Sequence, residues 1–101
     1  MSRLYEKLQQ EKETILSTAS RHRATNVRLF GSVVRGEEHD ASDVDFLVDF
    51  LVDFLPGSTL FDQIELIDEL SQILGRKVDV VSSRALNKHL RQRVLDEASP
   101  L

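Results

Sequence analysis

The sequence predicts an α/β or α+β domain, a small β-sheet covered on one face by helices, with the elements in the order α-β-β-α-β-α. Two observations predict this fold class. Apolar residues recur at helical spacing in three segments, and short runs rich in β-branched and aromatic residues stand between them. The chain has 101 residues, a length typical of one domain, so we expect residues 1–101 to form a single unit.

The first helix and the first strand are expected before residue 31. Residues 2–22 carry a helical stripe formed by Leu4, Leu8, Ile15 and Ala19. The remaining positions are mostly polar, which is typical of a helix on the surface of a protein. Residues 26–30 alternate and are rich in β-formers, so we expect a short strand that leads directly into Gly31 and Ser32. Residues 36–42 (GEEHDAS) resemble a loop.

The next segment repeats a tetrapeptide. Residues 43–57 read DVDFLVDFLVDFLPG, in which Val-Asp-Phe-Leu occurs three times in succession. In a strand that begins at Val44, valine and phenylalanine would share one apolar face, while aspartate and leucine would alternate on the other. In a helix the same repeat would leave apolar groups on three sides. We therefore predict a strand, which Pro56 and Gly57 end.

A helix, a strand and a last helix complete the chain. Residues 59–74 are predicted to be helical, with Ser58 as N-cap and Gly75 as the C-terminal glycine. The expected apolar face of this helix consists of Leu60, Ile64, Ile67, Leu70 and Leu74. Residues 77–81 (KVDVV) predict a second buried strand, and the apolar positions 86, 90, 94 and 98 predict a last helix, which Pro100 ends.

The composition excludes several classes of protein. No apolar run is long enough to span a bilayer, and the absence of cysteine excludes disulfides and thiolate zinc sites, so we expect a cytoplasmic protein. His22, His39 and His89 lack the spacing of zinc ligands. The net charge is −4, and no lysine or arginine lies between Arg35 and Arg76. Basic residues are too few and too dispersed to predict direct nucleic-acid binding; those of the last helix, Arg84, Lys88, Arg91 and Arg93, are expected to be a solvated face.

Two short motifs point to phosphate chemistry. Gly31 and Ser32 directly follow a predicted strand, where glycine allows the backbone to approach a phosphate and the hydroxyl and amides can donate to its oxygens. Ten residues later, Asp43 and Asp45 stand at i and i+2, so on a strand they project from the same face about 7 Å apart. Paired carboxylates repel each other unless a cation joins them, and oxygen ligands suit magnesium.

Asp79 is a third candidate. It interrupts an otherwise apolar strand, and an unpaired buried carboxylate would cost several kcal/mol. It therefore either faces solvent at an edge of the sheet or belongs to a functional site.

These residues resemble the GSx10DxD motif of the nucleotidyltransferase superfamily that includes DNA polymerase beta. Gly31-Ser32 and Asp43-x-Asp45 match the motif itself. The short length, Arg35-Gly36-Glu37, the helix start PGSTLFD and the segment GRKVDVV resemble the minimal nucleotidyltransferase (MNT) antitoxins in particular. The resemblance covers residues 26–101 and implies a small mixed sheet flanked by helices.

The resemblance also implies roles for individual residues. Gly31 and Ser32 would hold the phosphates of ATP, and Asp43 and Asp45 would bind Mg²⁺. Asp79 would bind a second Mg²⁺ or accept the proton of the attacking hydroxyl. Arg35 could reach a phosphate as a bidentate donor, although an ordinary surface arginine is the alternative.

The resemblance further implies a partner. MNT proteins are typically antitoxins that transfer AMP from ATP to a tyrosine of a HEPN ribonuclease toxin, which an adjacent gene encodes. We therefore expect a Mg²⁺-dependent adenylyltransferase in a hetero-oligomer with such a toxin. The alternative is an antitoxin without catalytic activity that neutralises the toxin by binding alone.

The repeat leaves part of the structure open. Relative to the MNT family, the third copy of Val-Asp-Phe-Leu looks like an insertion, which would either extend the strand by about 13 Å or bulge near residues 50–55. Asp43 and Asp45 lie upstream and should be spared in both cases. Asp49 and Asp53 are predicted to be surface or edge acids, and deletion of residues 52–55 should leave nucleotidyl transfer intact.

Overall fold

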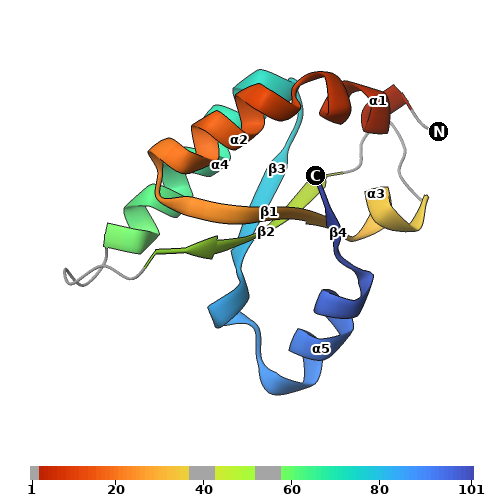
Figure 1. Cartoon of the computed structure of the whole chain (residues 1–101), viewed down its shortest axis with the longest axis vertical. Helices are drawn as coiled ribbons and strands as arrows, with labels where there is room; N and C mark the ends of the chain where they lie inside the picture. Colours follow the sequence, from red (N-terminus) through yellow and green to blue (C-terminus); the bar gives the residue numbers. More distant parts are fainter. Residues whose placement is uncertain (1–2, 37–42, 52–57) are drawn as a thin grey trace.

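Four strands form one mixed sheet in the computed structural model, which describes residues 3–36, 43–51 and 58–101. The strands are β1 (Ala24–Phe30), β2 (Val44–Phe50), β3 (Val78–Ser82) and β4 (Ser99–Pro100), and their order in the sheet is β3-β2-β1-β4 (Figure 1). The inner strand β2 is parallel to β3 and antiparallel to β1, and β4 is antiparallel to β1. Three of these strands are predicted from the sequence, whereas β4 replaces the expected end of the last helix.

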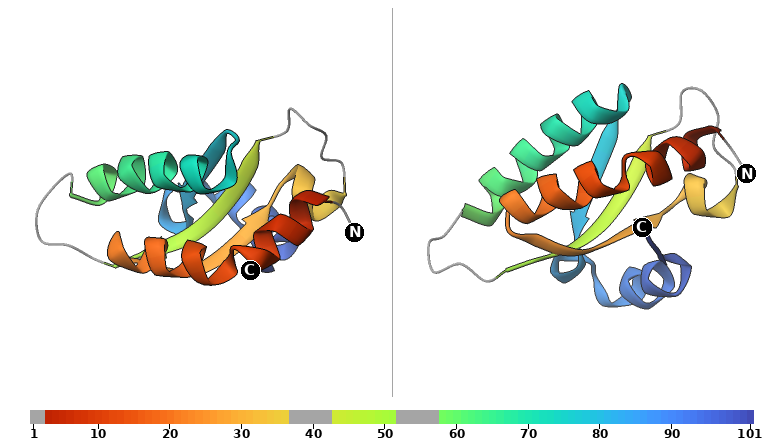
Figure 2. Two further views of the ribbon diagram at one scale, coloured as in Figure 1. Left: turned by 90° about the horizontal axis from the view of Figure 1, so that it is seen from above. Right: turned by 45° about the horizontal axis from the view of Figure 1, so that its top comes forward.

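Helices lie on both sides of this sheet. They are α1 (Arg3–Gln10), α2 (Lys12–Arg21), α3 (Ser32–Arg35), α4 (Ser58–Leu74) and α5 (Lys88–Glu97), together with the short 3₁₀ helix η1 (Ser83–Ala85). The pair α2 and α4 packs on one face, and α5 lies on the opposite side (Figure 2). The helices therefore flank the sheet instead of covering one face only. The single helix predicted for residues 2–22 is interrupted at Glu11.

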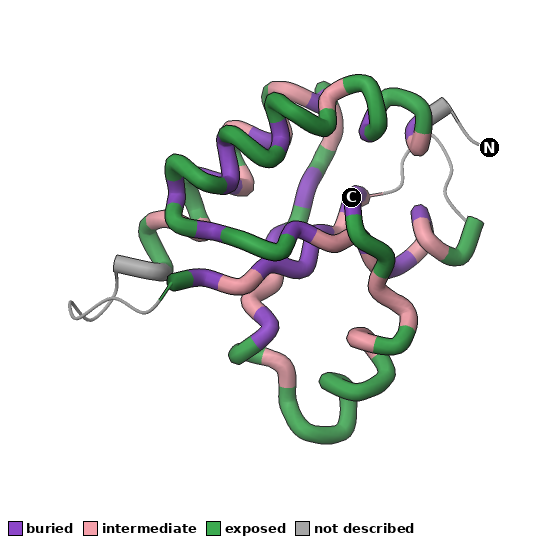
Figure 3. Tube along the Cα trace, viewed as in Figure 1, coloured by how far each residue is buried: buried purple, intermediate pink, exposed green. Residues whose placement is uncertain are grey.

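The core lies between the sheet and the pair α2 and α4. The even positions of β2 face this core: Val44, Phe46, Val48 and Phe50 are all buried. They pack with leucine and isoleucine side chains of the helices, and the buried positions of Figure 3 gather along this interface. The apolar face predicted for the repeat is thus confirmed within the described residues. Its odd positions are left to face the other side of the sheet.

The buried face of α4 differs from the predicted one. Leu70 and Leu74 are buried as expected, but Leu66 completes this face, while Leu60 and Ile64 are 58% and 55% exposed. Apolar residues occupy more than one stripe of this helix, so the helical period alone did not identify the stripe that meets the sheet. No helix in the described ranges is both long and apolar enough to cross a membrane.

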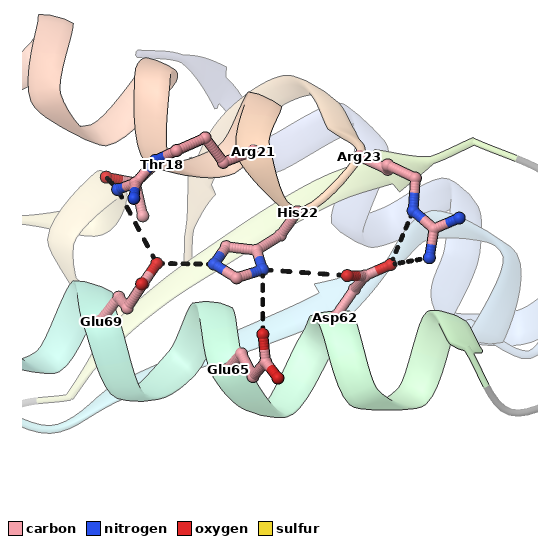
Figure 4. A network of polar contacts seen from close by, with 7 residues as sticks. All are labelled: Thr18, Arg21, His22, Arg23, Asp62, Glu65 and Glu69. Carbon is pink, nitrogen blue, oxygen red and sulfur yellow. Dashed lines mark hydrogen bonds and ion pairs between the residues drawn. The ribbon is translucent and has the colours of Figure 1, made fainter.

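A polar cluster joins the end of α2 to α4 (Figure 4). His22 is buried, and its Nε2 atom lies 2.6 Å from Glu69 Oε2. Its Nδ1 atom lies 3.5 Å from Glu65 and 3.8 Å from Asp62. Arg23 also binds Asp62, at 2.6 Å. His22 therefore serves as a polar link between two helices.

The segment 52–57, with the third copy of Val-Asp-Phe-Leu, and the segment 37–42 lie outside the described residues. Asp53 and His39 lie in these segments, so what the sequence predicts for them stays a prediction. The choice between an extended and a bulged third copy likewise stays open.

Candidate functional site

Two aspartates lie side by side on the face of the sheet opposite α2 and α4. The parallel pairing of β2 and β3 sets Asp45 directly beside Asp79. Neighbouring strands are about 4.8 Å apart, and paired residues of parallel strands project from the same face. Phe46 and Val80, the next residues of the two strands, are buried on the helix side, so both carboxylates point the other way. The structure thus brings together two of the three predicted acids.

Asp43, the third acid, immediately precedes β2. Its carboxylate lies 3.8 Å from Lys77 Nζ, and the next residue, Val44, donates its backbone amide to the carbonyl of Lys77. Asp43 contributes to the electrostatic potential at Asp45. It therefore lies at the same end of β2 as the pair of aspartates.

Gly31 adjoins this acidic pair from the other side. Phe30, the last residue of β1, pairs with Asp45, so Gly31 follows at the position beside the Asp45 carboxylate. Gly31 has φ 79° and ψ −150°, which is a conformation that only glycine adopts without strain. A β-carbon at this position would collide with Asp45 Oδ2. The glycine of the motif is thus required both by its backbone conformation and by the close approach of the carboxylate.

The residues after Gly31 form α3, a helix that was not predicted from the sequence. Ser32 is half-buried, and the backbone amide of Arg35 donates to the carbonyl of Gly31. The one-turn helix places the Arg35 guanidinium on the same side as the Gly31 amide, because both donate to the carboxylate of Glu97. The predicted phosphate-binding residues therefore lie together, next to the predicted metal-binding residues.

Glu97 is a further member of this site, and it was not predicted from the sequence. Its Oε1 atom accepts a hydrogen bond from Arg35 Nη1 at 2.7 Å, and its Oε2 atom accepts one from the Gly31 amide at 3.3 Å. The hydrogen bond from Arg35 lowers the pKa of Glu97, against the effect of burial. No spacing links Glu97 to the motif, since it lies 66 positions after Gly31 in the sequence.

The site carries excess negative charge. Burial raises the pKa of Asp45, and the neighbouring Asp79 and Asp43 raise it further. Arg35 acts in the opposite direction, whereas Glu97 adds to the repulsion. The carboxylate of Asp45 is therefore held in an environment that disfavours its charge, and a bound cation would relieve this repulsion.

The donor set fits a hard divalent cation. Carboxylate oxygens are the ligands that magnesium prefers, and Asp43, Asp45 and Asp79 supply several of them. In the described part of the chain, no three aspartate, glutamate or histidine side chains are already gathered closely enough to hold a metal ion. The present arrangement is thus a pair of carboxylates with a third at the end of the same strand.

Asp49 was predicted to be a surface or edge acid. Its side chain is 41% exposed, as expected of a surface residue, although it lies on β2, an inner strand of the sheet. It accepts hydrogen bonds from Ser83 at 2.5 Å, from Asn26 at 3.0 Å and from Arg28 at 2.7 Å. Burial alone would raise the pKa of Asp49, but these donors outweigh it and lower the pKa. Asp49 therefore links three elements and is no part of the acidic pair.

The basic residues near the last helix are solvated, as predicted. Arg84, Lys88, Arg91 and Arg93 are all exposed, and α5 contributes no buried residue.

Comparison with known proteins gives a consistent result. Residues 13–101 match the protein family described as Polymerase beta, Nucleotidyltransferase. The protein named "Putative protein adenylyltransferase MJ0435" of Methanocaldococcus jannaschii is 33% identical over 87 residues, which are 86% of this chain and 89% of that protein. Protein adenylyltransferase MntA of Thermococcus cleftensis is 39% identical over 71 residues, which are 70% of this chain and 68% of that protein.

Solved structures share the fold. A structure described as a "putative minimal nucleotidyltransferase" has a TM-score of 0.80 and 47% sequence identity, and the match covers 95% of this chain and 94% of that chain. A mutant form of the toxin-antitoxin MntA-HpeT has a TM-score of 0.69 and 25% identity, over 89% of this chain and 70% of that chain.

Proposed function

The chain belongs to the polymerase-beta nucleotidyltransferase family, and from this premise we propose that it is an antitoxin that transfers AMP from ATP to a tyrosine hydroxyl of a HEPN-type toxin. The observation that carries the proposal is the position of Asp45, which stands between Asp79 on one neighbouring strand and Gly31 at the end of the other. Metal-binding and phosphate-binding groups are thereby adjacent, as phosphoryl-group transfer requires.

The phosphate-binding groups come from the turn after β1. Gly31 leaves room for a close approach to its amide, Ser32 adds a hydroxyl, and Arg35 adds a guanidinium that can bind two phosphate oxygens. These groups would position the triphosphate so that its α-phosphorus lies near Asp45 and Asp79. Positioning of this kind accounts for much of the rate acceleration in phosphoryl transfer.

Asp43, Asp45 and Asp79 would hold Mg²⁺, in a site for two ions. The raised pKa of Asp45 supports this assignment, because it reflects negative charge without a sufficient counterion. When bound, magnesium neutralises charge on the phosphate oxygens and on the attacking and leaving oxygens.

The reaction consists of one in-line displacement. The acceptor hydroxyl oxygen forms a bond to the α-phosphorus of ATP, and the bond from the α-phosphorus to the bridging oxygen breaks, so that pyrophosphate leaves. The hydroxyl proton passes to a carboxylate, for which Asp79 is the candidate, since it is exposed on β3 and adjoins Asp45. The products are the adenylylated acceptor and pyrophosphate.

The acceptor would be supplied by another protein. We take residues 1–101 as one minimal nucleotidyltransferase domain, which acts in the cytoplasm as part of a hetero-oligomer. Two relatives support a protein acceptor and a toxin partner: MntA of Thermococcus cleftensis is named a protein adenylyltransferase, and MntA-HpeT is described as a toxin-antitoxin.

Incubation with radiolabelled ATP, Mg²⁺ and the HEPN protein from the adjacent gene tests the proposal. We expect label on the toxin, and none with the double variant Asp43→Asn and Asp45→Asn. Asp68→Asn is the matched control, because Asp68 is an exposed acid of α4 whose hydrogen bond joins it to Gln72. Absence of label with the unmodified protein would refute the enzymatic proposal. Toxin neutralisation that survives the double substitution would support binding alone.

A further inference from the structure

Glu97 occupies the groups that the proposed function assigns to phosphate. Its two carboxylate oxygens are bound separately, one by Arg35 Nη1 at 2.7 Å and one by the Gly31 amide at 3.3 Å. A guanidinium and a backbone amide are donors that bind phosphate oxygens in the same way. Glu97 thus presents two anionic oxygens where a nucleotide phosphate would present its own.

The fold holds Glu97 in this place through the residues that follow it. Ser99 and Pro100 form β4, which pairs with β1 at Arg28 and Leu29. Leu101 donates its backbone amide to the carbonyl of Val27 at 3.2 Å, and its side chain is buried. Leu29 pairs with Ser99, so continuing this antiparallel register places Glu97, two residues before Ser99, beside Gly31, two residues after Leu29.

The helix that carries Glu97, α5, is attached more weakly to the rest of the protein than β4 and Leu101 are. None of the residues of α5 is buried, so its attachment depends on its two ends and on polar contacts such as that of Glu97 with Arg35. A helix without buried apolar residues can shift at a small cost in free energy. Release of the Glu97 side chain therefore does not require the core to open.

The charges make simultaneous binding unfavourable. Glu97 is held ionised by Arg35, and it adds to the repulsion that Asp45 already experiences from Asp79 and Asp43. A triphosphate would bring further negative charge to the same donors. The N–H group of Gly31 points in one direction, so a carboxylate oxygen and a phosphate oxygen cannot both accept its hydrogen bond at the same time.

We propose that Glu97 is an intramolecular competitor of nucleotide, which occupies the phosphate subsite formed by Gly31 and Arg35 in the free protein and is displaced when nucleotide binds. This inference rests on the proposed function, because it takes these donors to be the phosphate subsite. As a consequence, the free protein binds nucleotide more weakly than it would if Glu97 did not occupy the Gly31 amide and the Arg35 guanidinium. A partner protein that draws the end of α5 away from Gly31 would raise the affinity for nucleotide.

Calorimetric titration of the protein with the ATP analogue AMP-PNP, in the presence of Mg²⁺ and in the absence of an acceptor protein, tests the inference. Glu97→Gln and Glu97→Ala should both bind the analogue more tightly than the unmodified protein, by about fivefold, the scale of one partly exposed charged contact. Asp96→Asn is the matched control, because Asp96 is the preceding residue of the same helix, is exposed and accepts a hydrogen bond from Gln92 instead. Its affinity should not change. Unchanged or weaker binding by folded Glu97 variants would overturn the inference while leaving the proposed function intact.

A second titration separates this result from failure of the proposed function. Inorganic triphosphate is added to isotopically labelled protein, and the NMR signal of the Gly31 amide is followed. We expect this signal to shift at a lower ligand concentration in Glu97→Gln than in the unmodified protein, even if AMP-PNP binds to neither. A shift at lower triphosphate concentration in Glu97→Gln would support competition for the phosphate subsite, whereas a failure of AMP-PNP to bind either protein would refute the proposed function. Identical titration curves for the two proteins would overturn the competition.

Discussion

Gly31 lies against the carboxylate of Asp45 so closely that a β-carbon at residue 31 would overlap Oδ2. The two residues come from different strands, and the antiparallel pairing of Phe30 with Asp45 determines their contact. The backbone proposed to bind phosphate and the carboxylate proposed to bind the metal are thus in direct contact in the sheet. A substitution at Gly31 should disturb both.

The variant Gly31→Ala should lose nucleotidyl transfer and become less stable by about 1–3 kcal/mol, because strain from positive φ adds to the collision with Asp45. Gly75→Ala is the matched control: Gly75 also has positive φ, but a β-carbon there would meet no atom within 4 Å. It should cost about 1 kcal/mol and leave transfer intact. Thermal unfolding and label transfer measure the two effects. Equal losses of activity in both variants would contradict the role of the Gly31 contact.

The variant Asp45→Asn should be inactive yet more stable than the unmodified protein at neutral pH, because a neutral amide replaces a carboxylate whose charge is disfavoured at this position. The pKa of Asp45 is raised above its ordinary value of 3.8, so its folded form favours the protonated state. Asp45 therefore contributes most to the stability of the fold when it is protonated, below its ordinary pKa, and this contribution is lost as the pH rises through the pKa of the folded state. The stability gain of the variant should accordingly appear between acidic and neutral pH.

Thermal unfolding at several pH values checks this prediction, with Asp68→Asn as the control. Mg²⁺ should raise the melting temperature of the unmodified protein more than that of Asp45→Asn, because the carboxylate is then neutralised by the ion. A stability difference that does not change with pH would contradict the electrostatic explanation.

The variant Asp49→Asn should show the opposite pH dependence. The pKa of Asp49 is lowered, so its charge stabilises the fold above the ordinary value of 3.8, and this stabilisation is lost as the pH falls through the folded pKa. We expect a loss of about 1 kcal/mol at neutral pH, reduced by the partial exposure of the carboxylate. The difference in the free energy of unfolding between the two proteins, measured with urea, should be smaller near pH 3, because Asp49 is then closer to the neutral state of the asparagine. A larger difference in acid would refute the prediction.

The contrast between Asp45 and Asp49 shows what the sequence could predict and what it could not. Both residues occupy the same position in identical tetrapeptides, so the repeat alone does not distinguish them. The spacing from Gly31-Ser32 predicts that Asp45 is functional, and its pairing with Phe30 and Asp79 places it beside Gly31 and a second carboxylate. The donors around Asp49 come from Asn26, Arg28 and Ser83, on β1 and η1, and only the folded chain brings them together.

Glu97 was missed for a related physical reason. Its contact with Gly31 depends on β4, a strand of two residues that contains Pro100. Proline lacks an amide donor and normally ends a helix, so the sequence indicated the end of α5 but gave no sign of a strand after it. Strands β1 to β3 were predicted because their β-branched and aromatic residues fill a core. Most of their predicted first and last residues differ from the observed ones by no more than two positions.

The variant His22→Ala should destabilise the fold without reducing nucleotidyl transfer. His22 is buried between α2 and α4 and contacts Glu69, Glu65 and Asp62, away from the acidic pair on the other face of the sheet. Its removal leaves a cavity and takes a polar partner from Glu69, which should cost about 1–3 kcal/mol. His89→Ala is the matched control, because His89 is an exposed histidine of α5 and its loss should have little effect on stability. Denaturant unfolding and label transfer are the measurements. If His22→Ala kept full stability, the polar cluster would not be what joins α2 to α4.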